Sequence, residues 1–117
     1  SYMSDIASTL KSKNCKLFYM SVNPINSVMI TKAGKGARTE AQVREFNSKI
    51  RSGLSLNYKY IDTYSVLMKK GYGTNSSYSG TDAASDDGLH YTTKTFKRIY
   101  YYCITYLNTG SIDASIY

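Results

Sequence analysis

The run CKLFYMSV at residues 15–22 decides the class of fold that this sequence predicts. A short and nearly continuous apolar run of this length is typical of a strand buried on both faces, as in a parallel sheet. Asn23 and Pro24 end the run, because proline has no amide hydrogen to donate to a neighbouring strand. A similar stretch, YKYID at 58–62, predicts a second strand.

Helices are predicted before, between and after these strands. Thr39 and Gln42 have the spacing of a capping box, in which two side chains satisfy the free amides at a helix start. The helices predicted from capping and apolar spacing are 3–10, 39–54 with a stripe of Val43, Phe46, Ile50 and Leu54, and 63–70, with loops at 27–38 and 71–86.

The last helix is predicted to start at Thr92 or Thr93 and to be followed by a loosely ordered tail at 108–117. Side chains at helical spacing give it a full apolar face that should pack on the core. The members of this predicted stripe are Phe96, Ile99, Tyr100, Cys103, Ile104 and Leu107.

The alternation of helices and strands predicts an α/β fold with parallel strands and right-handed crossovers. Two parallel strands make a poor sheet, since each needs a neighbour and cover on both faces. We therefore expect residues 1–107 to form the carboxyl-terminal half of one domain. Its open strand edge should pair with the missing N-terminal half, with a second chain, or with another copy by strand exchange.

Composition narrows the classes of partner. The 117 residues have a formal net charge of +7 and a mean hydropathy of −0.38, but the basic residues are scattered, which argues against nucleic acid. No apolar run approaches the roughly 20 residues that span a bilayer, so no membrane partner is expected. Cys15 and Cys103 lack metal-ligand spacing, and with one histidine no metal or cofactor is predicted. They should be buried thiols or, in an exported protein, a disulfide.

The stretch SDDGLHYTTKTFKRIYYY at 85–102 holds the single histidine, His90, three residues after Asp87. In an open α/β sheet, functional groups collect in loops at the carboxyl ends of strands. A carboxylate on Nδ1–H would fix the tautomer of the imidazole and leave Nε2 to accept a proton from a nucleophile. A lone loop histidine is otherwise a surface residue, and Asp82 and Asp86 are alternative partners for it.

Other polar residues follow the strands. Asn23 is expected to line the cleft, as a substrate-binding residue. Ser21 is not expected to be a nucleophile, because it lies inside an apolar run without a glycine-flanked elbow. Asp62 is either a second carboxylate near the site or, as we prefer, the cap of the next helix.

Four segments together resemble the SGNH (GDSL-type) esterases. DGLHYTTKTFKRIYYYCITYL resembles the last conserved block of that family, in which Asp-Gly-x-His-Tyr opens the terminal helix. The four segments, in the family's order, are KLFYMSVNPI at 16–25, VREFNSKIRSGL at 43–54, YKYIDTYSVL at 58–67 and the block at 87–107.

The resemblance implies a flavodoxin-like, three-layer α/β/α sandwich and a serine esterase that hydrolyses acyl esters, chiefly acetyl, on small molecules or polysaccharides. It implies that Asp87 orients the base and that His90 activates a serine. Tyr91, next to His90, is expected to contact substrate. The family's association with bacterial surface polysaccharide implies a secreted or cell-surface location.

The sequence departs from the family in one important respect. It has no Gly-Asp-Ser block for the nucleophile, and no Gly-x-Asn block for the oxyanion hole before the strand predicted at 16–22, where the family has it. We therefore expect the serine and the oxyanion hole to lie outside these residues and the isolated chain to be inactive. The alternatives are a non-catalytic module that binds carbohydrate or protein through its tyrosines and, less favoured, a basic nucleic-acid-binding domain.

Overall fold

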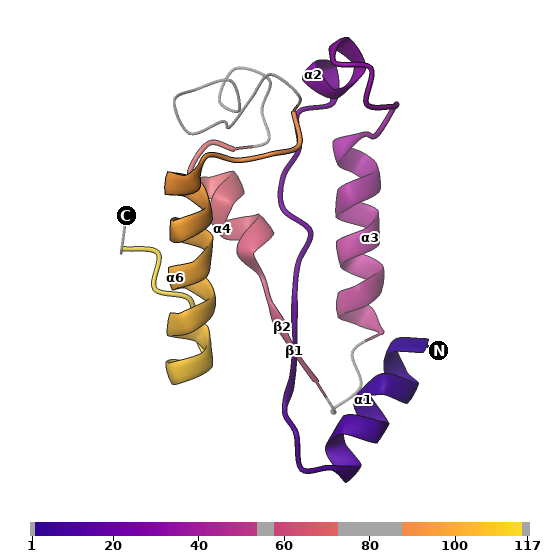
Figure 1. Ribbon diagram of the computed structural model, residues 1–117, viewed down its shortest axis with the longest axis vertical. Coiled ribbons are helices and arrows are strands. Elements are labelled where there is room, and N and C mark those ends of the chain that lie inside the picture. Colours follow the sequence, from indigo (N-terminus) through magenta and orange to yellow (C-terminus); the bar gives the residue numbers. More distant parts are fainter. Residues whose placement is uncertain (1, 54–57, 73–87, 116–117) are drawn as a thin grey trace.

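The computed structural model describes residues 2–53, 58–72 and 88–115 (Figure 1). None of the helices in these ranges is both long and apolar enough to cross a membrane. In chain order, the elements are α1 (Tyr2–Ser12), β1 (Leu17–Met20), α2 (Ser27–Lys32), α3 (Glu40–Ser52), β2 (Tyr58–Ile61), α4 (Thr63–Lys69) and α6 (Thr93–Thr109).

The two strands pair in parallel, as predicted. Leu17 lies opposite Tyr58 and Met20 lies opposite Ile61. Beyond the strand, the amide of Ser21 donates to the carbonyl of Ile61 at 3.0 Å, which extends the pairing by one residue. The α/β class is therefore confirmed, with a small sheet of two parallel strands in the part of the chain described.

Helices lie on both sides of the strand pair. Figure 1 shows α1 and α3 on one side, with α4 and α6 on the other. The alternation of strand side chains explains this arrangement. Phe18 meets Tyr106 of α6 edge to face at 6.2 Å, whereas Tyr60 lies under the guanidinium of Arg51 in α3 at 5.5 Å.

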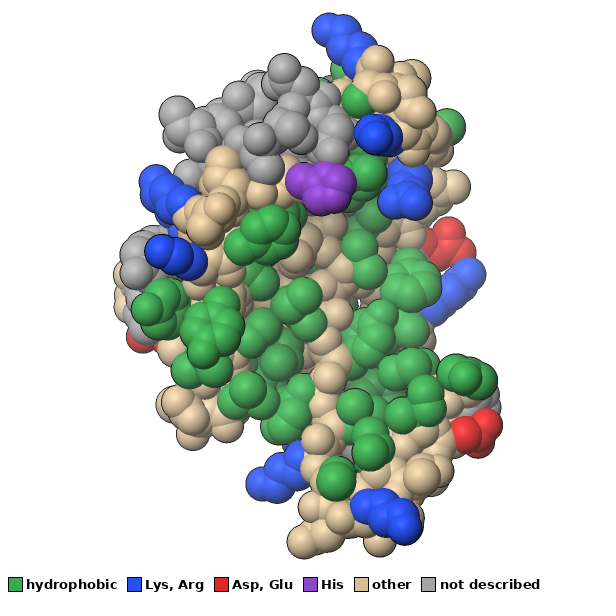
Figure 2. Space-filling view, in the orientation of Figure 1, with side chains coloured by type: hydrophobic (Ala, Val, Ile, Leu, Met, Phe, Trp, Pro, Cys, Tyr) green, Lys and Arg blue, Asp and Glu red, His purple; other side chains and the backbone are tan. Residues whose placement is uncertain are grey.

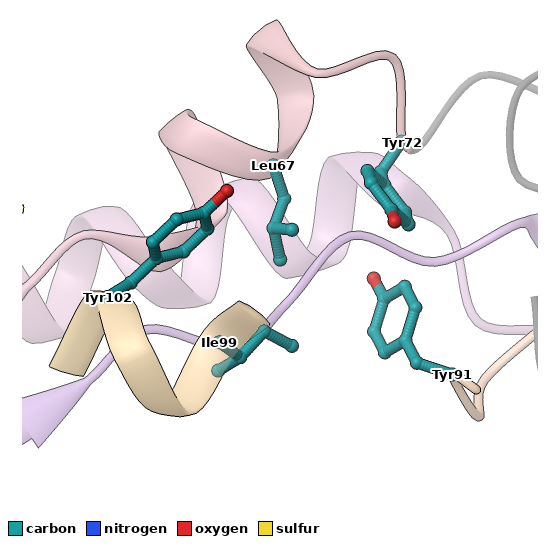
Figure 3. Packing of buried hydrophobic residues seen from close by; sticks show 5 residues of the cluster. All are labelled: Leu67, Tyr72, Tyr91, Ile99 and Tyr102. Carbon is teal, nitrogen blue, oxygen red and sulfur yellow. The ribbon is translucent and has the colours of Figure 1, made fainter. Parts of the chain in front are cut away.

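The core consists of two clusters of buried side chains. The larger joins α4 to α6 and contains Leu67, Tyr72, Tyr91, Ile99 and Tyr102 (Figure 3). The smaller joins α2 to α3 and contains Ile25, Ile30 and Val43. The larger cluster is rich in tyrosine, so the unusual tyrosine content of the sequence supplies much of the packing here.

Local capping sets the helix starts, largely as predicted. The capping box is present, with Gln42 N–H donating to Thr39 Oγ1 at 3.2 Å and Thr39 N–H donating to Gln42 Oε1 at 2.9 Å. Thr92 caps α6 by accepting from the Thr95 amide at 3.3 Å. The preferred prediction for Asp62 is also confirmed, because it accepts from the Ser65 amide at 3.0 Å and so caps α4.

Two predictions about helices were wrong. Residues 27–32 are helical within the expected loop, because the Asn26 side chain caps the Met29 amide at 3.1 Å and starts α2. In α6 the buried stripe is Thr95, Ile99 and Tyr102, whereas Phe96, Tyr100 and Leu107 of the predicted stripe are 50%, 61% and 48% exposed. This helix has apolar side chains on nearly all sides, so their spacing alone does not determine which side is buried.

The carboxyl-terminal segment also differs from the expected loose tail. The helix continues to Thr109, and the following residues fold back. The amide of Asp113 donates to Thr105 Oγ1 at 3.0 Å, and Lys70 Nζ donates to the carbonyl of Ala114 at 2.8 Å. Ile112 and Ala114 pack against the larger core cluster, so residues 110–115 are attached to the fold.

The two cysteines are free thiols. Cys15, expected to be buried, is exposed at the end of the turn after α1. Cys103 is partly buried on α6, where its Sγ lies 3.5 Å from Met20 Sδ. Burial raises the pKa of the Cys103 thiol, since the thiolate is less well solvated there.

Candidate active site

The carboxyl ends of the two strands are joined by a buried chain of hydroxyl groups. Ser21 Oγ and Thr63 Oγ1 lie 3.1 Å apart, and Thr63 donates to Asn23 Oδ1 at 2.8 Å. Because Thr63 has one hydroxyl proton and gives it to Asn23, Ser21 donates to Thr63. Ser21 also accepts from the Tyr64 amide at 2.8 Å.

Two polar residues that follow β1, Ser21 and Asn23, have a structural role in this network. Ser21 is 1% exposed and holds the start of α4 through the Tyr64 amide, which agrees with its exclusion as a nucleophile. Asn23 is half-buried with its carbonyl oxygen engaged by Thr63, so the contact with substrate predicted for it stays a prediction.

Asn47 of α3 holds the segment that follows β1. Its Oδ1 accepts from the Val22 amide and its Nδ2 donates to the Val22 carbonyl, both at 2.9 Å. The buried side-chain amide thus takes the place of a neighbouring strand. This residue was not predicted from the sequence, although a polar residue four positions after Val43, on the buried side of the helix, was an available signal.

The turn at residues 88–91 carries His90. Its other three residues contact the segment that follows β1 or the smaller core cluster. Gly88 accepts from the Asn26 amide at 3.0 Å, and it has a φ of +75°. A Cβ on Gly88 would overlap the Asn26 carbonyl and lie 2.9 Å from the Ile30 nitrogen, so only glycine fits. Leu89 packs against the smaller core cluster.

Tyr91 completes the attachment of this turn. It is 4% exposed, and its hydroxyl donates to the Pro24 carbonyl. Its ring meets Tyr72 at 5.5 Å, as Figure 3 shows. Tyr91 therefore connects the turn to the end of β1, and the contact with substrate predicted for it stays a prediction.

His90 is the exposed member of this turn. Figure 2 shows the histidine, in purple, at the surface of the face in view. Since its neighbours at 88, 89 and 91 are buried or packed, the backbone of His90 is fixed while its imidazole faces outward. Its predicted partner Asp87, and the alternatives Asp82 and Asp86, lie outside the described residues.

Other charged groups near the strand ends pair with one another. Tyr64 donates to Glu40 Oε1 at 2.7 Å, and Glu40 lies 3.5 Å from Arg44. Burial, together with the bond to the Glu40 carboxylate, raises the pKa of the Tyr64 hydroxyl, so it remains a proton donor. Asp62 lies 3.3 Å from Arg51. These contacts connect α3 to the start of α4, and they do not form an acid–base pair.

Within the described ranges, no group of three or more histidine, cysteine, aspartate or glutamate side chains could hold a metal ion. Of the sequence-predicted acid–base pair, the structure describes His90, whose imidazole faces outward on a turn with packed neighbours. An imidazole can accept a proton from a hydroxyl group or donate one to a leaving group near neutral pH.

No family model matches the chain, and no curated protein or solved structure is significantly similar to it. The resemblance to the SGNH esterases therefore stays a prediction based on the four sequence segments.

Proposed function

We propose that this chain supplies the Asp87 and His90 half of the catalytic triad of an SGNH-type serine esterase. The substrates are acyl esters, chiefly acetyl esters on carbohydrate. One observation carries the proposal: the exposed His90 stands on a turn anchored beside the carboxyl end of β1 in a parallel pair. Open α/β sheets place their functional groups at this end of their strands.

The proposed chemistry is that of a serine triad. Asp87 accepts a hydrogen bond from His90 Nδ1–H and stabilises the imidazolium. His90 Nε2 takes the proton of the serine hydroxyl as the oxygen attacks the ester carbonyl, and then gives it to the departing alcohol. Water repeats the sequence on the acyl-serine, which releases the acid and regenerates the free enzyme.

The proposal places the serine on a further strand beside β1. Because the Ser21 amide faces β2, the main-chain groups of Phe18 and Met20 face the opposite edge. No strand in the described ranges covers that edge. A strand added there would bring its own carboxyl end close to His90, and further strands would complete a three-layer α/β/α sandwich.

Exposed apolar side chains support a covering partner at this edge. Met20, Phe46 and Phe96, from β1, α3 and α6, are each at least 40% exposed. Figure 2 shows hydrophobic side chains gathered over these elements on the face in view. Contiguous apolar surface of this kind usually marks a protein contact. The partner that supplies the serine is an N-terminal segment of the same polypeptide or a second chain, whereas another copy would cover the edge by strand exchange without supplying it.

The test is to express a tagged copy in the producing cell, purify it with its partners, and incubate the material with a fluorophosphonate probe. Intact-mass spectrometry then locates the adduct. We expect one adduct on a polypeptide segment outside these 117 residues. His90→Ala should abolish the adduct, Asp87→Asn should weaken labelling by orders of magnitude, and Lys97→Ala, an exposed change on α6, should leave labelling intact.

Three results would contradict the proposal in different ways. An adduct within this chain that His90→Ala abolishes would keep the base but place the serine here. An adduct indifferent to His90→Ala would remove the role of His90. No adduct on any co-purifying polypeptide would leave the alternative of a non-catalytic module, for which titration with acetylated and plain oligosaccharides is the next measurement.

A further inference from the structure

A cavity lies at the other end of the strand pair from His90. It has a volume of about 520 Å³, within the range usual for small-molecule sites. Leu17 and Tyr58, the first residues of β1 and β2, line it, together with the carboxyl-terminal end of α6. It shares no lining residue with the histidine turn, so binding at this cavity does not depend on the proposed esterase.

The charge of this cavity is one-sided. Lys11, Lys16 and Lys59 line it, and none of its lining residues in the described part of the chain carries a carboxylate. Gly110, which caps the carboxyl-terminal end of α6, also lines it. The dipole of that helix end contributes about half a negative charge, which three full positive charges outweigh. The cavity therefore attracts anions.

Its walls are also apolar and aromatic. Phe18 and Tyr106 meet edge to face at 6.2 Å, and both line the cavity with Tyr58 and Leu107. These side chains come from the two strands and from α6, so the wall is made by regular elements. Rings held in this way offer a flat contact surface to an aromatic or acyl group at little cost in side-chain entropy.

We propose that this cavity binds an amphipathic anion, with its apolar body against Phe18 and Tyr106 and its acidic head group among Lys11, Lys16 and Lys59. The head group is a carboxylate, sulfonate or phosphate, and the body is an aromatic ring system or a short acyl chain. A neutral molecule of the same shape would make the ring contacts but would lack the partner for the lysines, and an inorganic anion would lack the ring contacts.

Two fluorescent probes test the proposal on the full chain. 8-Anilinonaphthalene-1-sulfonate carries the anionic head group, and N-phenyl-1-naphthylamine has the same ring system without it. We expect Lys16→Glu/Lys59→Glu to weaken binding of the sulfonate by about tenfold while the neutral probe changes by less than about twofold. Both lysines are exposed, so the fold should be retained.

The matched control is Lys32→Glu/Lys97→Glu, which changes the net charge equally at exposed sites that do not line the cavity. It should leave sulfonate binding within about twofold. Leu107→Glu, which places a carboxylate at a half-exposed position of the wall, should also weaken the sulfonate. Equal losses in both lysine pairs, or unchanged sulfonate binding in Lys16→Glu/Lys59→Glu and Leu107→Glu, would overturn the proposal and assign the probe to the exposed apolar face.

Discussion

The two ends of the parallel strand pair are built in opposite ways. At the carboxyl end, hydrogen bonds link Ser21, Thr63 and Asn23, and Asn47 engages both main-chain groups of Val22. At the amino end, lysines and aromatic rings surround an open cavity. One end is held closed by buried polar contacts, and the turn that carries the outward imidazole of His90 is attached beside it. The other retains space and unbalanced charge.

The buried polar contacts thus lie at the carboxyl end of the strand pair, and the space that could hold a ligand lies at the amino end. The turn of His90 is positioned by buried contacts, as the proposed role of a reacting group would require. The amino end is instead suited to reversible binding. Substitutions at the closed end should therefore cost stability, in proportion to the contacts that each one removes.

Gly88→Ala should have the largest effect. The added methyl group meets the Asn26 carbonyl and the Ile30 nitrogen, and the φ of +75° is strained for alanine. We expect a loss of at least about 3 kcal/mol in the free energy of unfolding, measured in urea. Gly34→Ala is the control, because its φ of +67° is similar but nothing lies within 4 Å of its added Cβ. It should cost about 1 kcal/mol, and equal losses would remove the steric argument.

Asn47→Ala should come next. It removes both hydrogen bonds to Val22 from a side chain that is 6% exposed. We expect about 2 kcal/mol of destabilisation by the same measurement. Asn108→Ala, at an exposed position of α6, should stay within about 0.5 kcal/mol. A neutral Asn47→Ala would mean that water replaces the amide and that the carboxyl end is open to solvent.

Two tyrosines should respond in opposite directions to loss of the same atom. Tyr91→Phe removes the hydrogen bond to the Pro24 carbonyl and should destabilise the protein by about 1 kcal/mol. Tyr102→Phe removes a buried hydroxyl that has no hydrogen-bond partner in the described structure, and it should stabilise by up to about 1 kcal/mol. Thermal unfolding of both variants checks this, and losses of equal size would contradict the assignment of the two hydroxyls.

The smallest expected effect on the fold is in the labelling of the two cysteines, because the initial rate is measured on protein whose packing is unchanged. Cys15 lines the amino-end cavity and is exposed, whereas burial raises the pKa of Cys103. At pH 7.5, we expect a thiol reagent to modify Cys15 at least about tenfold faster. Cys15→Ser should remove the fast phase. Since the raised pKa lowers the thiolate fraction of Cys103, its rate should be low near neutral pH and should keep increasing as the pH is raised.

Local patterns predicted much of the fold. The two strands, the capping box of Thr39 and Gln42, the cap by Asp62 and the start of α6 all depend on residues within four positions of one another, or on apolar runs. The exposure of His90 on a turn that leads into α6 also fits the sequence pattern.

The contacts that position the candidate site were not predictable in this way. The bonds of Asn47 to Val22 span 25 positions, and that of Tyr91 to Pro24 spans 67. Nothing in the local spacing of either residue specifies its partner. The rotation of α6 was missed for a different reason: Thr95 is a poor core residue until Tyr72 lies 2.9 Å from its hydroxyl, which only the tertiary fold provides.

The two hydrogen bonds between Asn47 and Val22 limit how far a further strand can pair with β1. Main-chain groups of alternate residues face alternate edges, so Val22 faces the same edge as Phe18 and Met20, which no strand among the described residues covers. Asn47 already occupies both of its groups. An incoming strand can therefore form its ladder along Phe18 and Met20 but not past them. A single side-chain amide would thus set the point at which the hydrogen bonds of an added strand end.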